Sequence, residues 1–167
     1  LVANHAAMRA LQLRESVDGL VVGMNLMLLP GVSISFAGAG MTSPHGACHT
    51  FDSRADGYAR GEACTTSALR TKPDGIALAS VLGSAVRCDG KSASLTAPNG
   101  QAQQALLRAA LSDATVGAAA LSCAEAHGTG TALGDPIEVG SFSAVVLHGR
   151  IDVAAAPLPL CGVKATV

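Results

Sequence analysis

Residues 125–138 carry the side chains with the clearest chemical potential. They read Glu-Ala-His-Gly-Thr-Gly-Thr-Ala-Leu-Gly-Asp-Pro-Ile-Glu and place His127 at the end of an apolar stretch, directly before a glycine. An imidazole with so little steric cover can donate a hydrogen bond to a developing oxyanion or exchange a proton near neutral pH. Thr129 and Thr131 alternate along the loop and could offer hydroxyls to an amide-bearing substrate. A single histidine is more often structural than catalytic, so the residue types alone leave both interpretations open.

The same loop can be compared with a phosphate-binding cradle, because Gly128, Gly130 and Gly134 lie between a predicted strand and a predicted helix. Their spacing is one residue away from the dinucleotide-binding fingerprint. Asp135 and Glu138 also stand at the start of the helix, where a phosphate would bind and two carboxylates would repel it. The sequence therefore disfavours a nucleotide site.

A metal site is conceivable where His45, Cys48, His49 and Asp52 gather in the sequence. Adjacent Cys48 and His49 cannot easily face one ion, and no second ligand pair follows, so we predict no metal site. The five cysteines are Cys48, Cys64, Cys88, Cys123 and Cys161. Their odd number, without a Cys-x-x-Cys spacing, predicts unpaired thiols in a reducing compartment.

Helical periodicity identifies elements that would position this loop. Apolar residues recur at helical spacing near the start of the chain and again after residues 98–100 (Pro-Asn-Gly), which predicts two helices. The first helix would bury Ala3, Ala6, Ala7, Ala10 and Leu11. The second would bury Ala102, Ala105, Leu106, Ala109 and Ala110. A third helix is predicted from Pro136, with Asp135 as its N-cap and Glu138 in a capping-box arrangement.

Apolar runs predict the strands that alternate with these helices. The predicted strands cover residues 20–29, 63–69, 76–86, 119–126 and 158–167. Turns are expected at residues 30–31 and 72–75, and residues 38–61 form a loop region of the kind in which sites occur. Near-continuous apolar strands between helices indicate a layered α/β fold.

Composition excludes several classes of protein. The chain has 167 residues, of which 49% are hydrophobic and 14% charged, so it is not a disordered tail. Its net charge of −1 provides no basic field to hold nucleic acid or acidic lipid. Residues 20–44 carry no charge, but Asn25, Pro30 and several glycines make a buried strand and a turn fit better than a membrane-spanning helix.

Residues 125–138 resemble the His-Gly-Thr-Gly-Thr signature of β-ketoacyl synthase (ketosynthase) domains. Further motifs match the family in the same order, at residues 23–30, 43–46, 50–52, 55–62, 95–100 and 162–164. The resemblance spans nearly the whole chain. It is strongest to ketosynthases of type I modular or iterative polyketide synthases.

The resemblance implies an incomplete thiolase-like α-β-α-β-α fold and an acyltransferase that works as a homodimer. Such domains catalyse decarboxylative Claisen condensation of acyl and malonyl units, carried on the phosphopantetheine of acyl carrier protein, in polyketide or fatty acid biosynthesis. No cofactor is expected to bind directly, and we expect a cytoplasmic location. By the resemblance, His127 is the first of two catalytic histidines, and Lys164 organises the site by charge and hydrogen bonding. Thr129 and Thr131 correspond to threonines that contact the pantetheine arm.

The resemblance also predicts where the rest of the site lies. The family's nucleophilic cysteine would precede Leu1 and its second catalytic histidine would follow Val167, so residues 1–167 are expected to be an internal part of a ketosynthase domain. No cysteine of the chain stands in the nucleophile context, and the 167 residues alone are expected not to condense substrates. A non-condensing decarboxylase or a carrier-protein docking module is the alternative. Structural roles, in loop pairing and helix capping, are expected for Asp52, Arg60, Glu62 and Asp135.

Overall fold

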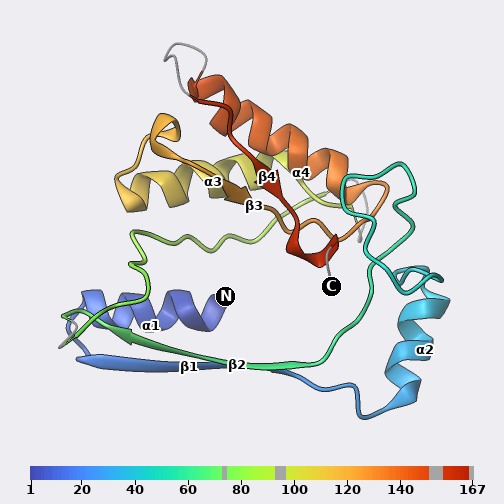
Figure 1. Cartoon of the computed structure of the whole chain (residues 1–167), viewed down its shortest axis with the longest axis horizontal. Helices are drawn as coiled ribbons and strands as arrows, with labels where there is room; N and C mark the ends of the chain where they lie inside the picture. Colours follow the sequence, from blue (N-terminus) through green and yellow to red (C-terminus); the bar gives the residue numbers. More distant parts are fainter. Residues whose placement is uncertain (73–74, 93–96, 151–155, 166–167) are drawn as a thin grey trace.

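The computed structural model describes residues 1–72, 75–92, 97–150 and 156–165. Within these residues the α-helices are α1 (Val2–Gln12), α2 (Pro30–Gly38), α3 (Gly100–Ala114) and α4 (Gly134–Phe142). The strands are β1 (Asp18–Asn25), β2 (Ala63–Arg70), β3 (Ala124–Glu125) and β4 (Leu160–Cys161). Figure 1 shows two groups of elements, α1 with the β1–β2 pair and α3 and α4 with the β3–β4 pair.

β1 and β2 form an antiparallel pair whose register runs from Asp18 opposite Arg70 to Asn25 opposite Ala63. The pair is closed at one end by a bidentate contact, in which Arg70 Nε and Nη2 lie 2.6 and 3.1 Å from the two carboxylate oxygens of Asp18. Hydrogen bonding by this guanidinium holds the pKa of the Asp18 carboxyl below its usual range. The predicted strand at residues 63–69 is confirmed.

α1 packs against the β1–β2 pair. Met8 and Leu11 are its buried residues, and Leu11 Cδ1 is 3.9 Å from the position that a Cβ would take at Gly19 of β1. The predicted first helix is confirmed. Its predicted face is partly wrong, because Ala3 and Ala6 are exposed and Met8 is buried.

Within residues 20–44 the predicted strand is confirmed in part, whereas its predicted end, its predicted burial and the turn predicted after it are wrong. β1 ends at Asn25, and the expected turn at residues 30–31 is the first turn of α2, where the fixed φ of Pro30 suits an N-terminal helical position. β1 is also not buried in this chain, since Leu20 and Val22 are 71% and 57% exposed. Side chains alternate along a strand, so these two point to the face opposite α1.

Residues 76–86 do not form the predicted strand. A Cβ at Gly83 would lie 2.7 Å from Ala114 Cα, so the segment crosses the end of α3 at close range. Ser84 N donates to Asp113 Oδ2 at 2.9 Å. The segment is therefore held by α3 and not by a neighbouring strand. The turn predicted at residues 72–75 lies partly outside the described residues.

A polar cluster joins α1 to α3 through this segment. Arg9 Nη2 is 2.7 Å from Asp113 Oδ1 and donates to the Ser84 carbonyl oxygen at 3.1 Å. His5 Nδ1 is 2.5 Å from Ser84 Oγ. The Ser84 N–H and then the Arg9 guanidinium hold the pKa of the Asp113 carboxyl below its usual range.

β3 and β4 are parallel, with Ala124 opposite Leu160 and Glu125 opposite Cys161. Both are shorter than the predicted strands at residues 119–126 and 158–167, the last two residues of which lie outside the described part of the chain. Residues 118–120 form a short 3₁₀-helix in place of the start of the predicted strand. The Arg150 guanidinium donates to the carbonyl oxygens of residues 118, 119 and 121 at 2.7, 3.3 and 2.8 Å, which holds this segment.

α3 begins as the sequence predicts. Asn99 is its N-cap, and its Oδ1 accepts the N–H groups of Gln101 and Ala102 at 3.0 and 3.2 Å. Ser141 Oγ of α4 donates to the Gly100 carbonyl oxygen at 3.1 Å, which ties the start of α3 to α4. The predicted apolar face of α3 is half-buried. None of the helices in the described residues is long and apolar enough to cross a membrane.

Candidate active site

His127 and Lys164 lie together at the carboxyl ends of the parallel strands β3 and β4. His127 follows β3 by two residues, and Lys164 follows β4 by three. Carboxyl ends of neighbouring parallel strands meet at one edge, which brings together residues that are distant in sequence. Lys164 Nζ is 3.2 Å from His127 Nδ1 and also donates to the His127 carbonyl oxygen. The structure thus joins the two residues that are the predicted catalytic pair.

The Lys164 contact bears on which nitrogen of His127 can act as a donor, because the roles in it depend on the tautomer of the ring. A lysine ammonium group has three donors and no acceptor, so an ammonium at this distance pairs with the tautomer whose Nδ1 accepts. A neutral imidazole that accepts at Nδ1 carries its proton on Nε2. His127 is exposed in this chain, which leaves the Nε2–H group open to a ligand.

The ends of β3 and β4 are also joined by Glu125. Its Oε1 accepts the N–H of Val163 at 2.6 Å. Next to it, the Ala126 N–H donates to the Cys161 carbonyl oxygen at 2.8 Å. The turn that carries Lys164 is therefore fixed to the strand that leads to His127.

Glu138 holds the backbone of the histidine loop and does not complete the predicted capping box. Its two carboxylate oxygens accept the N–H groups of His127 and Gly128 at 2.5 and 2.9 Å. The N-cap position of α4 belongs to Leu133, which makes no side-chain cap. The predicted capping box is wrong because two amides of the histidine loop, next to α4, use the carboxylate instead.

Asp135 acts on the same loop from the first turn of α4. It is buried, and its Oδ1 accepts the N–H groups of Gly130 and Thr131 at 3.1 and 3.2 Å. Its Oδ2 accepts the N–H of Phe51 at 2.8 Å. The predicted N-cap role is wrong, whereas the predicted loop pairing is confirmed. The loop amides that a phosphate would need are thus already paired with carboxylates.

Thr129 and Thr131 lie side by side on this loop. Their Oγ1 atoms are 3.5 Å apart, and both residues are half-buried. Gly130 separates them with a φ of +75°, a left-handed conformation that favours glycine. The alternation predicted from the sequence therefore places two hydroxyls together, on the loop that follows His127.

Comparison with known families matches both parts of the chain. Residues 1–75 match the beta-ketoacyl synthase N-terminal domain, and residues 78–167 match the beta-ketoacyl synthase C-terminal domain. The chain belongs to the β-ketoacyl synthase family.

Relatives of this ketosynthase chain agree with that assignment. It is 51% identical, over 87% of its length, to a subunit of the phenolphthiocerol/phthiocerol polyketide synthase of Mycobacterium tuberculosis. It is 42% identical, over 90% of its length, to another subunit of the same synthase in that species. The chain spans only 7% and 8% of the lengths of these two relatives.

Two solved ketosynthases have the same fold over 99% of the chain. The ketosynthase from module 6 of the bacillaene synthase of Bacillus subtilis superposes with a TM-score of 0.88 at 33% identity. An oxazolomycin ketosynthase domain of Streptomyces albus JA3453 gives 0.92 at 30% identity. The chain covers 30% of each of these structures, so it forms part of a thiolase-like layered α/β fold, as the sequence predicts.

Three further motif residues of the ketosynthase chain, for which structural roles are expected, make polar contacts outside the histidine loop. Asp52 binds Arg54 through both carboxylate oxygens, and hydrogen bonds from Arg54 hold the pKa of the Asp52 carboxyl well below its usual range. Arg60 donates to Ser33 Oγ of α2 at 2.8 Å. Glu62 Oε1 accepts the N–H of Met27 at 2.5 Å.

The cysteines of this ketosynthase chain form no disulfide among the described residues, and Cys48 binds a backbone amide. All five cysteines are unpaired, and Cys48 is the buried one. Cys48 Sγ accepts the N–H of Ala59 at 3.1 Å. Within the described residues, no three His, Cys, Asp or Glu side chains come together in a group that could hold a metal ion.

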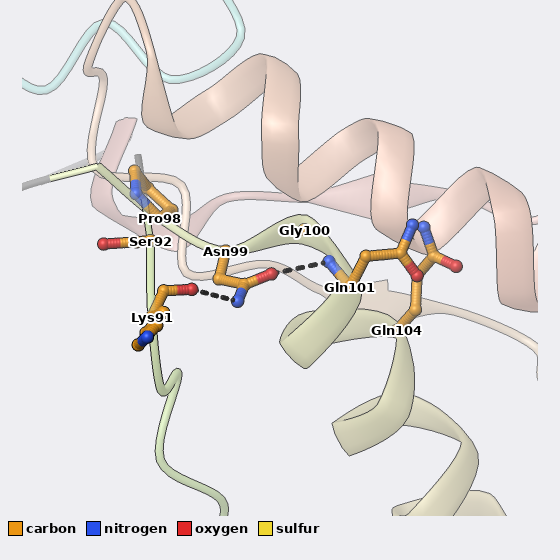
Figure 2. A pocket seen from close by; sticks show the side chains of 7 residues that line it. All are labelled: Lys91, Ser92, Pro98, Asn99, Gly100, Gln101 and Gln104. Carbon is orange, nitrogen blue, oxygen red and sulfur yellow. Dashed lines mark hydrogen bonds between the residues drawn. The ribbon is translucent and has the colours of Figure 1, made fainter. Parts of the chain in front are cut away.

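A separate open cleft of about 370 Å³ lies at the start of α3 (Figure 2). Lys91, Asn99 and Gln104 are among its lining residues. Asn99 Nδ2 donates to the Lys91 carbonyl oxygen at 2.9 Å while its Oδ1 caps the helix. The side-chain amide of Asn99 is thus already hydrogen-bonded to the backbone. Neither His127 nor Lys164 lines this cleft.

Thr50 is a site residue that the sequence does not reveal. It lies in one of the motifs that match the ketosynthase family, at residues 50–52, but nothing in the residue type indicates a role. In the structure its hydroxyl donates to the carbonyl oxygen of Gly128, the residue directly after His127, at 2.6 Å. The long loop at residues 38–61 thus contacts the loop that carries His127, which sequence spacing alone could not show.

Proposed function

We propose that this chain supplies the histidine and lysine of a ketosynthase active site, within a domain that catalyses decarboxylative Claisen condensation in polyketide biosynthesis. The observation that carries the proposal is the 3.2 Å contact between Lys164 Nζ and His127 Nδ1. It prepares an Nε2–H donor beside a cationic group, which suits a step that develops negative charge on oxygen. The mycobacterial polyketide synthase relatives support the class of product.

In the proposed reaction, the bond between the malonyl carboxylate and Cα breaks and carbon dioxide leaves. The electron pair of that bond moves into the thioester, whose oxygen becomes an enolate oxyanion. His127 Nε2–H donates to this oxygen, and the Lys164 charge lies close behind the imidazole. The enolate carbon then attacks the acyl thioester on the enzyme, forms the new carbon–carbon bond and releases the thiolate.

Substrate delivery in this proposal follows the family. Acyl carrier protein brings the malonyl unit on its phosphopantetheine arm, and the neighbouring hydroxyls of Thr129 and Thr131 bind the amides of that arm. The paired geometry of the two hydroxyls supports this assignment. We further propose that the complete domain is a homodimer and that a segment outside residues 1–167 supplies the thiol nucleophile and the second histidine. A cytoplasmic location stays a prediction.

The test uses a complete ketosynthase domain that includes these residues, with malonyl carrier protein as the substrate. Release of carbon dioxide and formation of the condensed product are measured for the wild type, His127→Ala and Lys164→Met. Lys91→Met is the matched control, because Lys91 is an exposed lysine at the separate cleft. Loss of a single oxyanion donor costs on the order of 10²–10³ in kcat, and we expect that loss for His127→Ala.

Lys164→Met is expected to lose both activities as well, whereas Lys91→Met keeps them. Wild-type release of carbon dioxide without a condensed product would instead identify a non-condensing decarboxylase. Full activity of His127→Ala would contradict the proposal.

A further inference from the structure

Thr50 bridges the two strand ends that carry His127 and Lys164. Its Oγ1 donates to the carbonyl oxygen of Gly128 at 2.6 Å. Gly128 follows His127 directly and has a φ of +48°, so the loop turns sharply at the point that Thr50 holds. The hydroxyl therefore fixes the backbone on the carboxyl side of the catalytic histidine.

The methyl group of Thr50 occupies the space between two glycines. Thr50 Cγ2 is 2.5 Å from the position that a Cβ would take at Gly128, and 2.5 Å from the corresponding position at Gly162. Gly162 lies directly before Val163 and Lys164. One methyl group thus contacts the backbones at the ends of both β3 and β4, and the absence of side chains at the two glycines makes this close approach possible.

Thr50 is itself held by its neighbours. The N–H of Phe51 donates to Asp135 Oδ2 at 2.8 Å, and Asp135 also binds the loop amides of Gly130 and Thr131. The N–H of Asp52 donates to the His49 carbonyl oxygen at 3.2 Å. Thr50 is therefore anchored to α4, the helix that also holds the His127 backbone through Glu138.

We infer that Thr50 is a positioning residue that sets the separation of His127 and Lys164. It acts through the backbones of Gly128 and Gly162 and does not touch the reacting atoms. The inference rests on the proposed function, because the Lys164–His127 contact matters for the reaction only if this pair is catalytic. A displacement of about 1 Å at a reacting group can cost about 10²-fold in rate, so a small shift of either backbone would be visible in kcat.

The test compares three variants of the complete domain that separate the two contacts. Thr50→Ser keeps the hydroxyl, Thr50→Val keeps the shape, and Thr50→Ala loses both. We expect kcat for malonyl decarboxylation to fall about 10²-fold in Thr50→Ala and less in the other two, while KM for malonyl carrier protein stays unchanged. Thr66→Ala is the matched control, because Thr66 is an exposed threonine of β2.

Gly162 provides a second measurement that does not depend on turnover. Gly162→Ala alone should displace the lysine turn, because the new Cβ meets the Thr50 methyl group. In the Thr50→Ala background that methyl is absent, so Gly162→Ala should be tolerated better. The two substitutions should therefore be non-additive in thermal unfolding and in the NMR signals of the His127 ring.

The outcomes separate the inference from the proposed function. A wild-type domain that neither decarboxylates nor condenses would contradict the proposed function. An active wild type whose kcat is unchanged in all three Thr50 variants would overturn the inference on Thr50. A decrease that is explained by loss of folded protein in Thr50→Ser and Thr50→Val would overturn it too, as would strict additivity of the Thr50 and Gly162 substitutions.

Discussion

The carboxylate of Glu138 accepts the backbone N–H of His127 at 2.5 Å, across the loop that joins β3 to α4. Its second oxygen accepts the following N–H, that of Gly128, at 2.9 Å. Lys164 contacts the ring of the same histidine at 3.2 Å. His127 is thus held at its backbone from α4 and at its ring from the end of β4, and its Nε2 takes part in neither contact.

Replacing Glu138 is expected to weaken catalysis by releasing this backbone. Hydrogen bonds to charged groups contribute roughly 1.5–3 kcal/mol each, and Glu138→Ala loses two of them. Glu138→Gln keeps one acceptor oxygen but turns an amide donor toward the second N–H, so its effect should be intermediate. Carbon dioxide release and amide hydrogen exchange at His127 measure the effect. Glu15→Ala, at an exposed position after α1, is the control, and equal activity of all three variants would exclude the role.

Gly130 is expected to tolerate no side chain. Its φ of +75° costs a non-glycine residue about 1–2 kcal/mol, and a Cβ there would lie 2.7 Å from the His49 backbone nitrogen. Gly130→Ala should therefore lower the free energy of unfolding by at least that amount. Gly140→Ala in α4 meets no atom within 4 Å and should raise it by about 0.5–1 kcal/mol. Urea denaturation measures the free energy of unfolding of both variants. A similar change of this free energy in the two variants would contradict the role of the Gly130 conformation.

Asp113 is expected to make stability fall in acid. Its pKa is lowered in the folded chain by the Ser84 N–H and by Arg9, so the unfolded chain takes up this proton first as the pH decreases. The contribution is complete above the ordinary pKa of 3.8 and is lost as the pH falls below it toward the folded-state value. Asp113→Asn should destabilise the domain more at about neutral pH than at about pH 3. The same loss of unfolding free energy at both pH values would show that the carboxylate charge is not responsible.

Local signals in the sequence are sufficient for some elements of the fold. Residues 98–100 and the periodic apolar face after them predict α3, because these signals and the helix lie within a few residues of each other. Pro30 misleads, since a proline at the first position of a helix gives the same signal as a turn, and the apolar residues that follow do not define a face. Residues 76–86 have the composition of a strand, but contacts with the end of α3 override it.

The candidate site also contains residues that local sequence signals reveal and residues that only the fold brings together. His127 and its threonines stand out within one short motif, whereas Lys164 is 37 residues away and meets the histidine only through the pairing of β3 with β4. Asp135 and Glu138 have the spacing of helix caps, yet their carboxylates bind loop amides that the fold brings within reach. Thr50 is more distant still, 78 residues from the carbonyl that it binds, and its residue type carries no signal.

The protonation of the His127 ring tests the central claim most directly. In a complete domain with nitrogen-labelled histidine, NMR of the ring nitrogens distinguishes Nδ1 from Nε2, and His127→Gln assigns the signal. The Lys164 contact predicts a neutral ring with the proton on Nε2 and an unprotonated Nδ1, and Lys164→Met should alter that pattern. A proton on Nδ1 in the wild type, or a ring unaffected by Lys164→Met, would contradict the account.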